Sequence, residues 1–239
     1  MLVSAEAEYY MKQKTINLMA AGALAFAMVS CSSLYSKHLA GAESGIAEDQ
    51  YVIGTCYLDG DVPGGMTNKA LAAEWFLKAA QQGNVKAQNA LGMMYEKGDG
   101  MPQSDEKAIE WYKRAALKGY SEAQYNLGHY YSTLDKSGGF DTDSEAHRIY
   151  TRLLEEAAKW YRMAAVQNHA DAQFELGRIY SYAAYNNKRA GRVRANLGGD
   201  MNDYRAYRNE ALEWLRKAAA QGNPRHIENY QYTCKNSLD

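Results

Sequence analysis

This chain has few of the residues on which most enzyme and metal sites depend. Its 239 residues include only three cysteines, three prolines and five histidines. No Cys-x-x-Cys pair is present and no two histidines have the spacing of metal ligands, so we predict neither a metal site nor a redox dithiol. The sequence also lacks a Gly-x-Ser-x-Gly elbow, a phosphate-binding loop and a dinucleotide-binding fingerprint. We therefore expect no catalytic residue, no cofactor and no enzyme activity.

The chain also lacks an excess of charge of either sign. It contains 27 Lys and Arg residues against 28 Asp and Glu residues, which gives a net charge of −1 at pH 7. Domains that bind nucleic acid usually carry a basic excess, so we expect no nucleic-acid partner. Long apolar runs are absent as well, except for one between residues 16 and 29 that follows two lysines.

That apolar run has the features of a secretory signal peptide. It is shorter than the ~20 residues that a membrane-spanning helix needs. Basic residues before a short apolar core are typical of such leaders, so we predict a signal peptide over residues 1–30. Residues 1–10 carry two acidic side chains and no basic one, and we therefore expect translation to start at Met11.

The segment Met28-Val29-Ser30-Cys31 resembles a bacterial lipobox, in which the cysteine is lipid-modified and becomes the first mature residue. The resemblance implies lipid attachment at Cys31. Ser32 in place of Asp then implies an outer-membrane lipoprotein of the bacterial cell envelope that faces the periplasm. The alternative is a cleaved signal peptide in which Cys31 has no role. We expect residues 31–45, which are short and polar, to form a tether between the lipid and the first helix.

After this leader, two blocks of residues recur along the chain. The first block contains all four tryptophans, each followed by a pair of alanines and then by Gly or Asn, and occupies residues 73–83, 109–119, 158–168 and 212–222. The second block carries Ala, Leu-Gly and Tyr at helical spacing and occupies residues 87–95, 123–131 and 172–180. Such self-similarity indicates a repeat array, and each unit is predicted to be a helix-turn-helix. Gly and Asn at the block ends favour left-handed helix caps.

A glycine recurs inside the second block, at Gly92, Gly128 and Gly177, and also at Gly54 in a weaker copy. A glycine in the middle of a helix costs roughly 1 kcal/mol relative to alanine. Its recurrence predicts that a neighbouring helix packs against bare backbone at this position. The alanine pairs allow the same close approach, and the aromatic residues before them supply the large side chain.

Together the blocks resemble the Sel1-like repeat, a relative of the tetratricopeptide repeat, over about residues 46–235. The resemblance implies an all-α fold, a right-handed α-solenoid of antiparallel helix pairs. Residues 46–239 would form about four pairs and a C-terminal helix. The tryptophans are 36, 49 and 54 residues apart, so the third and fourth units carry insertions. We expect one helix over residues 143–167, and we expect the first half of the insertion at 181–203 to extend the preceding helix.

The resemblance also implies that the first helix of each unit lines a concave face that binds a partner. Two columns of residues, two positions before and two after the central leucine, are predicted to face it. The predicted contacts are Tyr51, Asn89, Tyr125 and Phe174 in the first column, and Met93, His129, Arg178 and Tyr232 in the second. Aromatic, Met and Arg side chains are enriched in interface cores. Met93 and Phe174 can equally fill the gap between neighbouring repeats, which is left open here.

The second insertion offers another candidate surface. Residues 186–209 contain six basic and two acidic side chains. Such a patch suits an acidic partner or anionic lipid headgroups, and the alternative is a solvated loop. The basic residues are Lys188, Arg189, Arg192, Arg194, Arg205 and Arg208.

Three functions remain open at this point. The leading hypothesis is a periplasmic, membrane-anchored and monomeric scaffold that binds a peptide or protein. The second is an immunity protein, because some lipoproteins with this repeat neutralise phospholipase effectors of type VI secretion. The third is a β-lactam-binding hydrolase, as assigned to certain cysteine-rich relatives. The cysteine pairs of those relatives are missing here, which argues against the third hypothesis.

Overall fold

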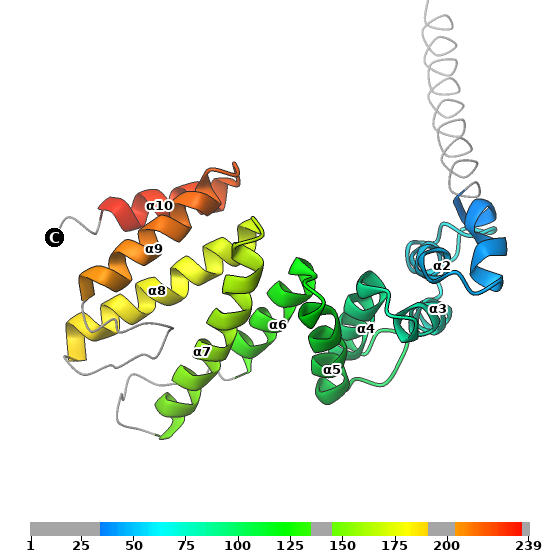
Figure 1. Ribbon diagram of the computed structural model, residues 1–239, viewed down its shortest axis with the longest axis horizontal. Coiled ribbons are helices and arrows are strands. Elements are labelled where there is room, and N and C mark those ends of the chain that lie inside the picture. Colours follow the sequence, from blue (N-terminus) through cyan, green and yellow to red (C-terminus); the bar gives the residue numbers. More distant parts are fainter. Residues whose placement is uncertain (1–33, 135–144, 191–203, 236–239) are drawn as a thin grey trace, which may run out of the picture. The chain divides into compact units, whose positions relative to one another are not determined.

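The computed structural model describes residues 34–134, 145–190 and 204–235, which contain helices and no strand (Figure 1). The predicted signal peptide and Cys31 lie outside these residues. The helices are α2 (Ala47–Asp59), α3 (Lys69–Gln81), α4 (Val85–Lys97), α5 (Asp105–Leu117), α6 (Ser121–Thr133), α7 (Glu145–Ala165), α8 (Ala170–Ala190), α9 (Tyr204–Ala219) and α10 (Pro224–Lys235). One more helix covers residues 34–43. The predicted all-α class is confirmed.

The chain divides into two compact units, Met1–Ala108 and Ile109–Asp239. In the first unit, α3 packs against both α2 and α4. In the second unit, each helix from α6 to α10 packs against the next one along the chain. We call α2, α4, α6, α8 and α10 the first helices. Helices α4, α6 and α8 carry the Leu-Gly block, α2 carries its weaker copy, and α10 follows the last tryptophan-bearing helix. The second helices are α3, α5, α7 and α9, which carry the tryptophans.

The helix ends follow the predicted caps. The residues that close the tryptophan block all have a left-handed backbone, with φ of 91° at Gly83, 87° at Gly119, 69° at Asn168 and 87° at Gly222. Within the described residues, Asn168 is the one non-glycine residue with positive φ. Asn tolerates this conformation better than most other side chains. The turn into each following first helix is therefore encoded locally.

The recurring glycines bring first and second helices into close contact, as predicted. A Cβ atom added to Gly128 would lie 2.8 Å from the Tyr161 ring, and one added to Gly54 would lie 2.6 Å from the Phe76 ring. At Gly177 the added atom would lie 2.7 Å from the side chain of Leu215. The large side chain of one helix thus rests directly on the backbone of its neighbour.

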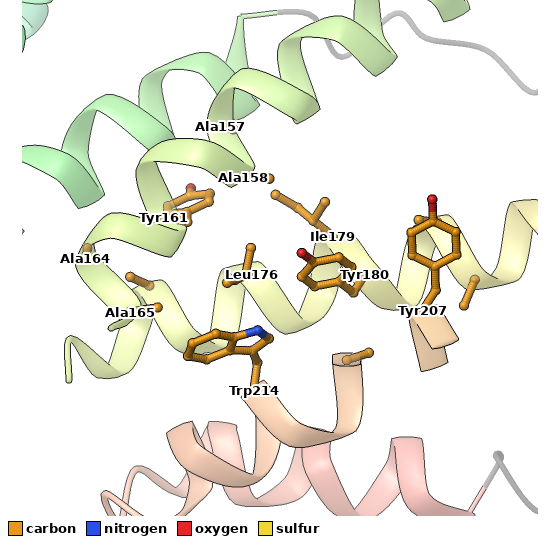
Figure 2. Close-up of a cluster of buried hydrophobic side chains, with 14 residues drawn as sticks. Ala157, Ala158, Tyr161, Ala164, Ala165, Leu176, Ile179, Tyr180, Tyr207 and Trp214 are labelled. Carbon is orange, nitrogen blue, oxygen red and sulfur yellow. The ribbon is translucent and has the colours of Figure 1, made fainter. Parts of the chain in front are cut away.

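The best-defined core lies in the second unit, between α7, α8 and α9 (Figure 2). Tyr161, Leu176 and Tyr180 are almost completely buried there, together with Trp214 from α9. Alanines of α7 and α8 surround them and let the helix axes approach closely. Burial of these rings and of the small residues between them provides the main driving force for stacking the pairs.

Both insertions lengthen helices, as expected. Helices α2 to α6 have 13 residues each, whereas α7 and α8 have 21. Helix α7 corresponds to the helix predicted at 143–167, and α8 extends through the first half of the second insertion. The added turns pack together, because the rings of Tyr150 and Tyr182 meet edge to face at 5.9 Å. No helix within residues 34–134, 145–190 and 204–235 is both long and apolar enough to cross a membrane.

The predicted tether over residues 31–45 is wrong from residue 34 onward. Residues 34–43 form a helix that packs on α2. Ala42 is 1% exposed, and its carbonyl oxygen accepts a hydrogen bond from Gln50 Nε2 at 3.2 Å. His38 Nδ1 lies 2.5 Å from Asp49 Oδ1, which adds a second contact to α2. This helix is therefore the second helix of an incomplete repeat.

This helix escaped prediction from the sequence because its resemblance to the end of α3 is short and its composition is polar. Gly41-Ala42-x-x-Gly45 has the same pattern of small residues as Ala79-Ala80-x-x-Gly83 at the end of α3. Gly45 has φ of 96°, as Gly83 has 91°. The other positions of this helix are largely polar, so the sequence shows no clear apolar stripe that would predict its buried side.

Candidate interaction surface

A row of glutamines positions the first helices, and sequence reasoning missed it. Near the start of α2, α4, α6 and α8, a buried glutamine donates from Nε2 to a carbonyl oxygen at the end of the preceding second helix. The pairs are Gln50 with Ala42, Gln88 with Ala80, Gln124 with Ala116 and Gln173 with Ala165, at 3.2, 3.0, 3.0 and 3.0 Å. Each bond satisfies a carbonyl that a helix end leaves without an intrahelical partner.

The same glutamines connect neighbouring repeats. Gln124 Oε1 accepts a hydrogen bond from Gln167 Nε2 at 2.8 Å, and Gln173 Oε1 accepts one from Gln221 Nε2 at 2.8 Å. In the first unit, Gln82 Nε2 donates to Gln50 Oε1 at 2.7 Å. A signal was available, because Ala-Gln recurs at the start of the Leu-Gly blocks. Within each unit, these bonds tie a first helix to the end of the following second helix and so help to set the spacing between neighbouring repeats.

The first predicted column fills the gaps between repeats. Phe174 is 2% exposed and stacks on His226, with ring centroids 4.4 Å apart. Asn89 is only 9% exposed. Tyr51 is half-buried against Phe76, at 5.7 Å between ring centroids. The prediction that Phe174 contacts a partner is therefore wrong, because its ring packs between α8 and α10. The burial of Asn89 contradicts the same prediction for that residue.

Tyr125 belongs to the same column and is half-buried between two histidines. Its ring stacks on His169 at 4.8 Å and on His129 at 6.2 Å, with interplanar angles of 18° and 13°. Burial raises the pKa of the Tyr125 hydroxyl, and the nearby carboxylates of Asp171 and Glu175 raise it further. The Tyr125 ring therefore packs between the His129 and His169 rings and restricts the position of His129.

The second predicted column is exposed. In the second unit, His129 is exposed, the Arg178 side chain is 53% exposed and Tyr232 is 70% exposed. In the first unit, Met93 is 38% exposed and therefore partly accessible to solvent. Arg178 forms a surface ion pair with Glu175 of the same helix at 2.9 Å. These side chains are exposed to solvent, and in one case, Tyr125 with His129, a residue of the first column packs against a residue of the second.

Three junctions between first helices, α2–α4, α6–α8 and α8–α10, carry a similar contact. An acidic residue and an aromatic residue three positions later share a basic side chain at the start of the next first helix. The sets are Glu48, Tyr51 and Lys86; Glu122, Tyr125 and His169; and Asp171, Phe174 and His226. Lys86 lies 2.9 Å from Glu48 Oε1 and holds the pKa of that carboxyl below its usual value.

The second candidate patch is only partly within the described residues. Arg192 and Arg194 lie outside them. Lys188 and Arg189 belong to α8 and Arg205 to α9, but their side chains also lie outside the described part of the chain. Arg208 is half-buried in α9. The described ranges contain no group of three or more His, Cys, Asp or Glu residues that could hold a metal ion.

Comparisons with known proteins point to one family. The sequence profile described as the Sel1 repeat matches six segments, which together make up more than half of the chain. The matched residues are 47–84, 85–120, 121–137, 151–169, 170–186 and 208–223. Among curated proteins, none matches the chain.

Solved structures of other proteins are similar to this chain. A Sel1 repeat protein from Oxalobacter formigenes is 25% identical with a TM-score of 0.58, and the match covers 82% of this chain and 65% of that one. The protective antigen c5321 of uropathogenic Escherichia coli strains, which displays an SLR fold, is 28% identical with a TM-score of 0.41, and the match covers 82% of this chain and 43% of that one. Immunity protein Pa5087 from Pseudomonas aeruginosa is 18% identical with a TM-score of 0.33, at coverages of 74% and 66%.

This chain thus spans less than two thirds of the length of the first two of these proteins. The repeated Leu-Gly and Trp blocks, the glycine contacts and the six matched segments all describe one architecture, an α-solenoid of the kind that serves as a scaffold for protein interactions. The chain belongs to the Sel1 repeat family.

Proposed function

We propose that this protein is an interaction scaffold that holds a peptide or protein segment against the exposed column of its first helices. The proposal rests on the difference in burial between the two columns. Residues of the first column are buried or half-buried, whereas His129, Arg178 and Tyr232 of the second column are exposed to solvent. Side chains fixed on packed helices lose little entropy on binding. Tyr and Arg are also the residues that most often dominate binding energy.

Photo-crosslinking in the native cell envelope identifies the partner. A benzophenone amino acid replaces His129 in one version of the protein. In the control it replaces Leu117, which is 74% exposed on the second helix α5. We expect a product from position 129 that position 117 does not form. If that product contains a lipase-like toxin, the alternative role as an immunity protein is favoured. Identical products from both positions would contradict a specific binding face.

Charge reversal at Arg178 tests the same face with the partner so identified. We expect Arg178→Glu to weaken binding by at least about tenfold, in the range of an interface hot spot. Folding should be retained, because an exposed ion pair such as Arg178–Glu175 contributes little stability. Arg216→Glu, the same charge change on an exposed position of α9, is the control. Binding affinity is measured by calorimetry, and equal affinities for both variants would exclude the first-helix face.

We also propose that the scaffold works as an outer-membrane lipoprotein facing the periplasm, anchored through Cys31. The support is the short apolar leader that ends at this cysteine. We expect the protein to incorporate labelled palmitate and to fractionate with membranes, and Cys31→Ala to abolish both. A Cys31→Ala protein that still carries the label would contradict the anchor.

The basic residues of the second insertion are proposed as a second contact, for an acidic partner. A double variant, Lys188→Glu with Arg189→Glu, is compared with Arg216→Glu in the same binding assay. We expect the double variant to bind more weakly and with a smaller dependence on salt. If the double variant binds with the same affinity as Arg216→Glu, the second insertion does not contact the partner.

A further inference from the structure

Asn84 and His169 occupy the same place in their repeats, the residue just before a first helix. Asn84 makes two contacts there. Its Oδ1 accepts a hydrogen bond from the backbone N–H of Ala87 at 3.0 Å, and its Nδ2 donates to Glu48 Oε2 at 2.8 Å. The side chain therefore caps α4 and also connects it to the preceding first helix, α2. These two contacts require one acceptor atom and one donor atom.

His169 repeats this arrangement with an imidazole. Its Nδ1 accepts a hydrogen bond from the backbone N–H of Ala172 at 3.3 Å. Its Nε2 lies 3.3 Å from Glu122 Oε1 on α6, at ion-pair distance but without a completed hydrogen bond. The side chain is 10% exposed and its ring stacks on Tyr125. The ring thus caps α8 and connects it to α6.

The cap requires a neutral ring with its proton on Nε2. A doubly protonated imidazole has an N–H at both nitrogens and no acceptor, so Nδ1 would confront the N–H of Ala172. The N-terminus of α8 also carries a partial positive charge that opposes a cation. Glu122 and Tyr125 on α6 face the ring, whereas Asp171 on α8, two residues further along the chain, pairs with His226. Glu122 favours a proton on the ring, but it cannot replace the lost cap.

We propose that His169 is a proton-sensitive cap that couples α8 to α6, and that protonation of the ring releases it. The cap contributes stability while Nδ1 is free to accept the N–H of Ala172, and that stability is lost when Nδ1 gains a proton. Asn84 makes the equivalent contacts in the first unit without titrating, so α4 keeps its cap. The inference does not depend on the identity of the partner.

Amide hydrogen exchange of the full chain at pH 7.5 and pH 5.5 tests the proposal, after correction for the intrinsic pH dependence of exchange. We expect protection of the first turns of α8 to fall about fivefold at pH 5.5, the equilibrium equivalent of one lost cap. The first turns of α4 serve as the internal reference and should not change. His169→Asn should keep the protection of α8 at pH 7.5 and lose its pH response.

Two results would overturn the proposal. One is an unchanged pH response of α8 in His169→Asn, which would assign it to another group. The other is equal or greater protection of α8 at pH 5.5 in the unaltered chain, which would mean that the Glu122 pair outweighs the cap. If His169→Asn does not fold, nitrogen NMR of the His169 ring in the unaltered chain still decides. We expect the proton on Nε2 at pH 7.5, and a proton on Nδ1 would exclude the capping role.

Discussion

Replacing Tyr161 by alanine is expected to lower the free energy of unfolding of the second unit by about 3–5 kcal/mol. Tyr161 is completely buried, and its ring lies against Gly128 and, at 5.7 Å, beside Tyr125. Removal of the ring opens a cavity between α6 and α7 that the alanine-rich surroundings cannot fill. The hydroxyl of Tyr161 also bonds Ser132 Oγ at 3.2 Å, so a polar contact is lost with it. Burial keeps the pKa of this hydroxyl well above its ordinary value.

Urea unfolding followed by circular dichroism and by tryptophan fluorescence measures the effect. The control is Tyr232→Ala, because Tyr232 is 70% exposed and its replacement should change stability by less than about 0.5 kcal/mol. A solenoid unfolds through its neighbour contacts, so separate transitions are expected to be visible for the two units. A loss of less than about 1 kcal/mol for Tyr161→Ala would show that the ring is not the main contact between these helices.

The second large effect is expected for Gly177→Ala, with a loss of about 2–3 kcal/mol from overpacking. A Cβ atom at this position would lie 2.7 Å from Leu215 Cγ and 3.2 Å from the carbonyl oxygen of Ala211. The side chain of Leu215 can rotate, but the backbone of α9 can relieve the contact only by moving the helix. The cost should therefore exceed the gain of about 1 kcal/mol that alanine brings to an ordinary helix.

Thermal and urea unfolding of Gly177→Ala again measure the effect. The matched control is Gln231→Ala, because Gln231 holds the equivalent position in α10 and is exposed. We expect that replacement to be neutral. Combining Gly177→Ala with Leu215→Ala should restore part of the loss, since the two side chains compete for one volume. If the double variant loses the full sum of both single effects, the two helices do not meet at this point.

Much of the fold could be predicted because the repeat encodes it locally. The Leu-Gly block, the alanine pair and the closing Gly or Asn each act within one or two helical turns. The close approach of a helix to Gly128 could be predicted from recurrence, because a glycine that destabilises a helix is expected to recur only where the packing requires it. The structure identified Tyr161 as the side chain that lies there. The incomplete repeat at 34–45 escaped prediction because it keeps only the small residues of the pattern, Ala42 among them.

The candidate surface was predicted less well. The spacing placed both columns on first helices, but spacing does not say how far a side chain lies from the next repeat. Phe174 and His129 each lie two positions from the central leucine of their block, one before it and one after it, yet Phe174 is buried and His129 is exposed. The glutamine row was missed as well. Ala-Gln recurs in the blocks, but recurrence does not name the partner, and the hydrogen bond between Gln124 and Gln167 spans 43 residues.

By itself, then, the sequence determined the helical class, the repeat unit, the caps and the glycines at which a neighbouring helix approaches the backbone. All of these depend on interactions within a unit or on a periodicity that every unit repeats. Only the tertiary structure decided which predicted contacts face solvent, how Gln173 and Gln221 connect successive repeats, and that His169 both caps α8 and faces Glu122. These features depend on the distance and angle between neighbouring helices, which are set by the packing of many side chains together.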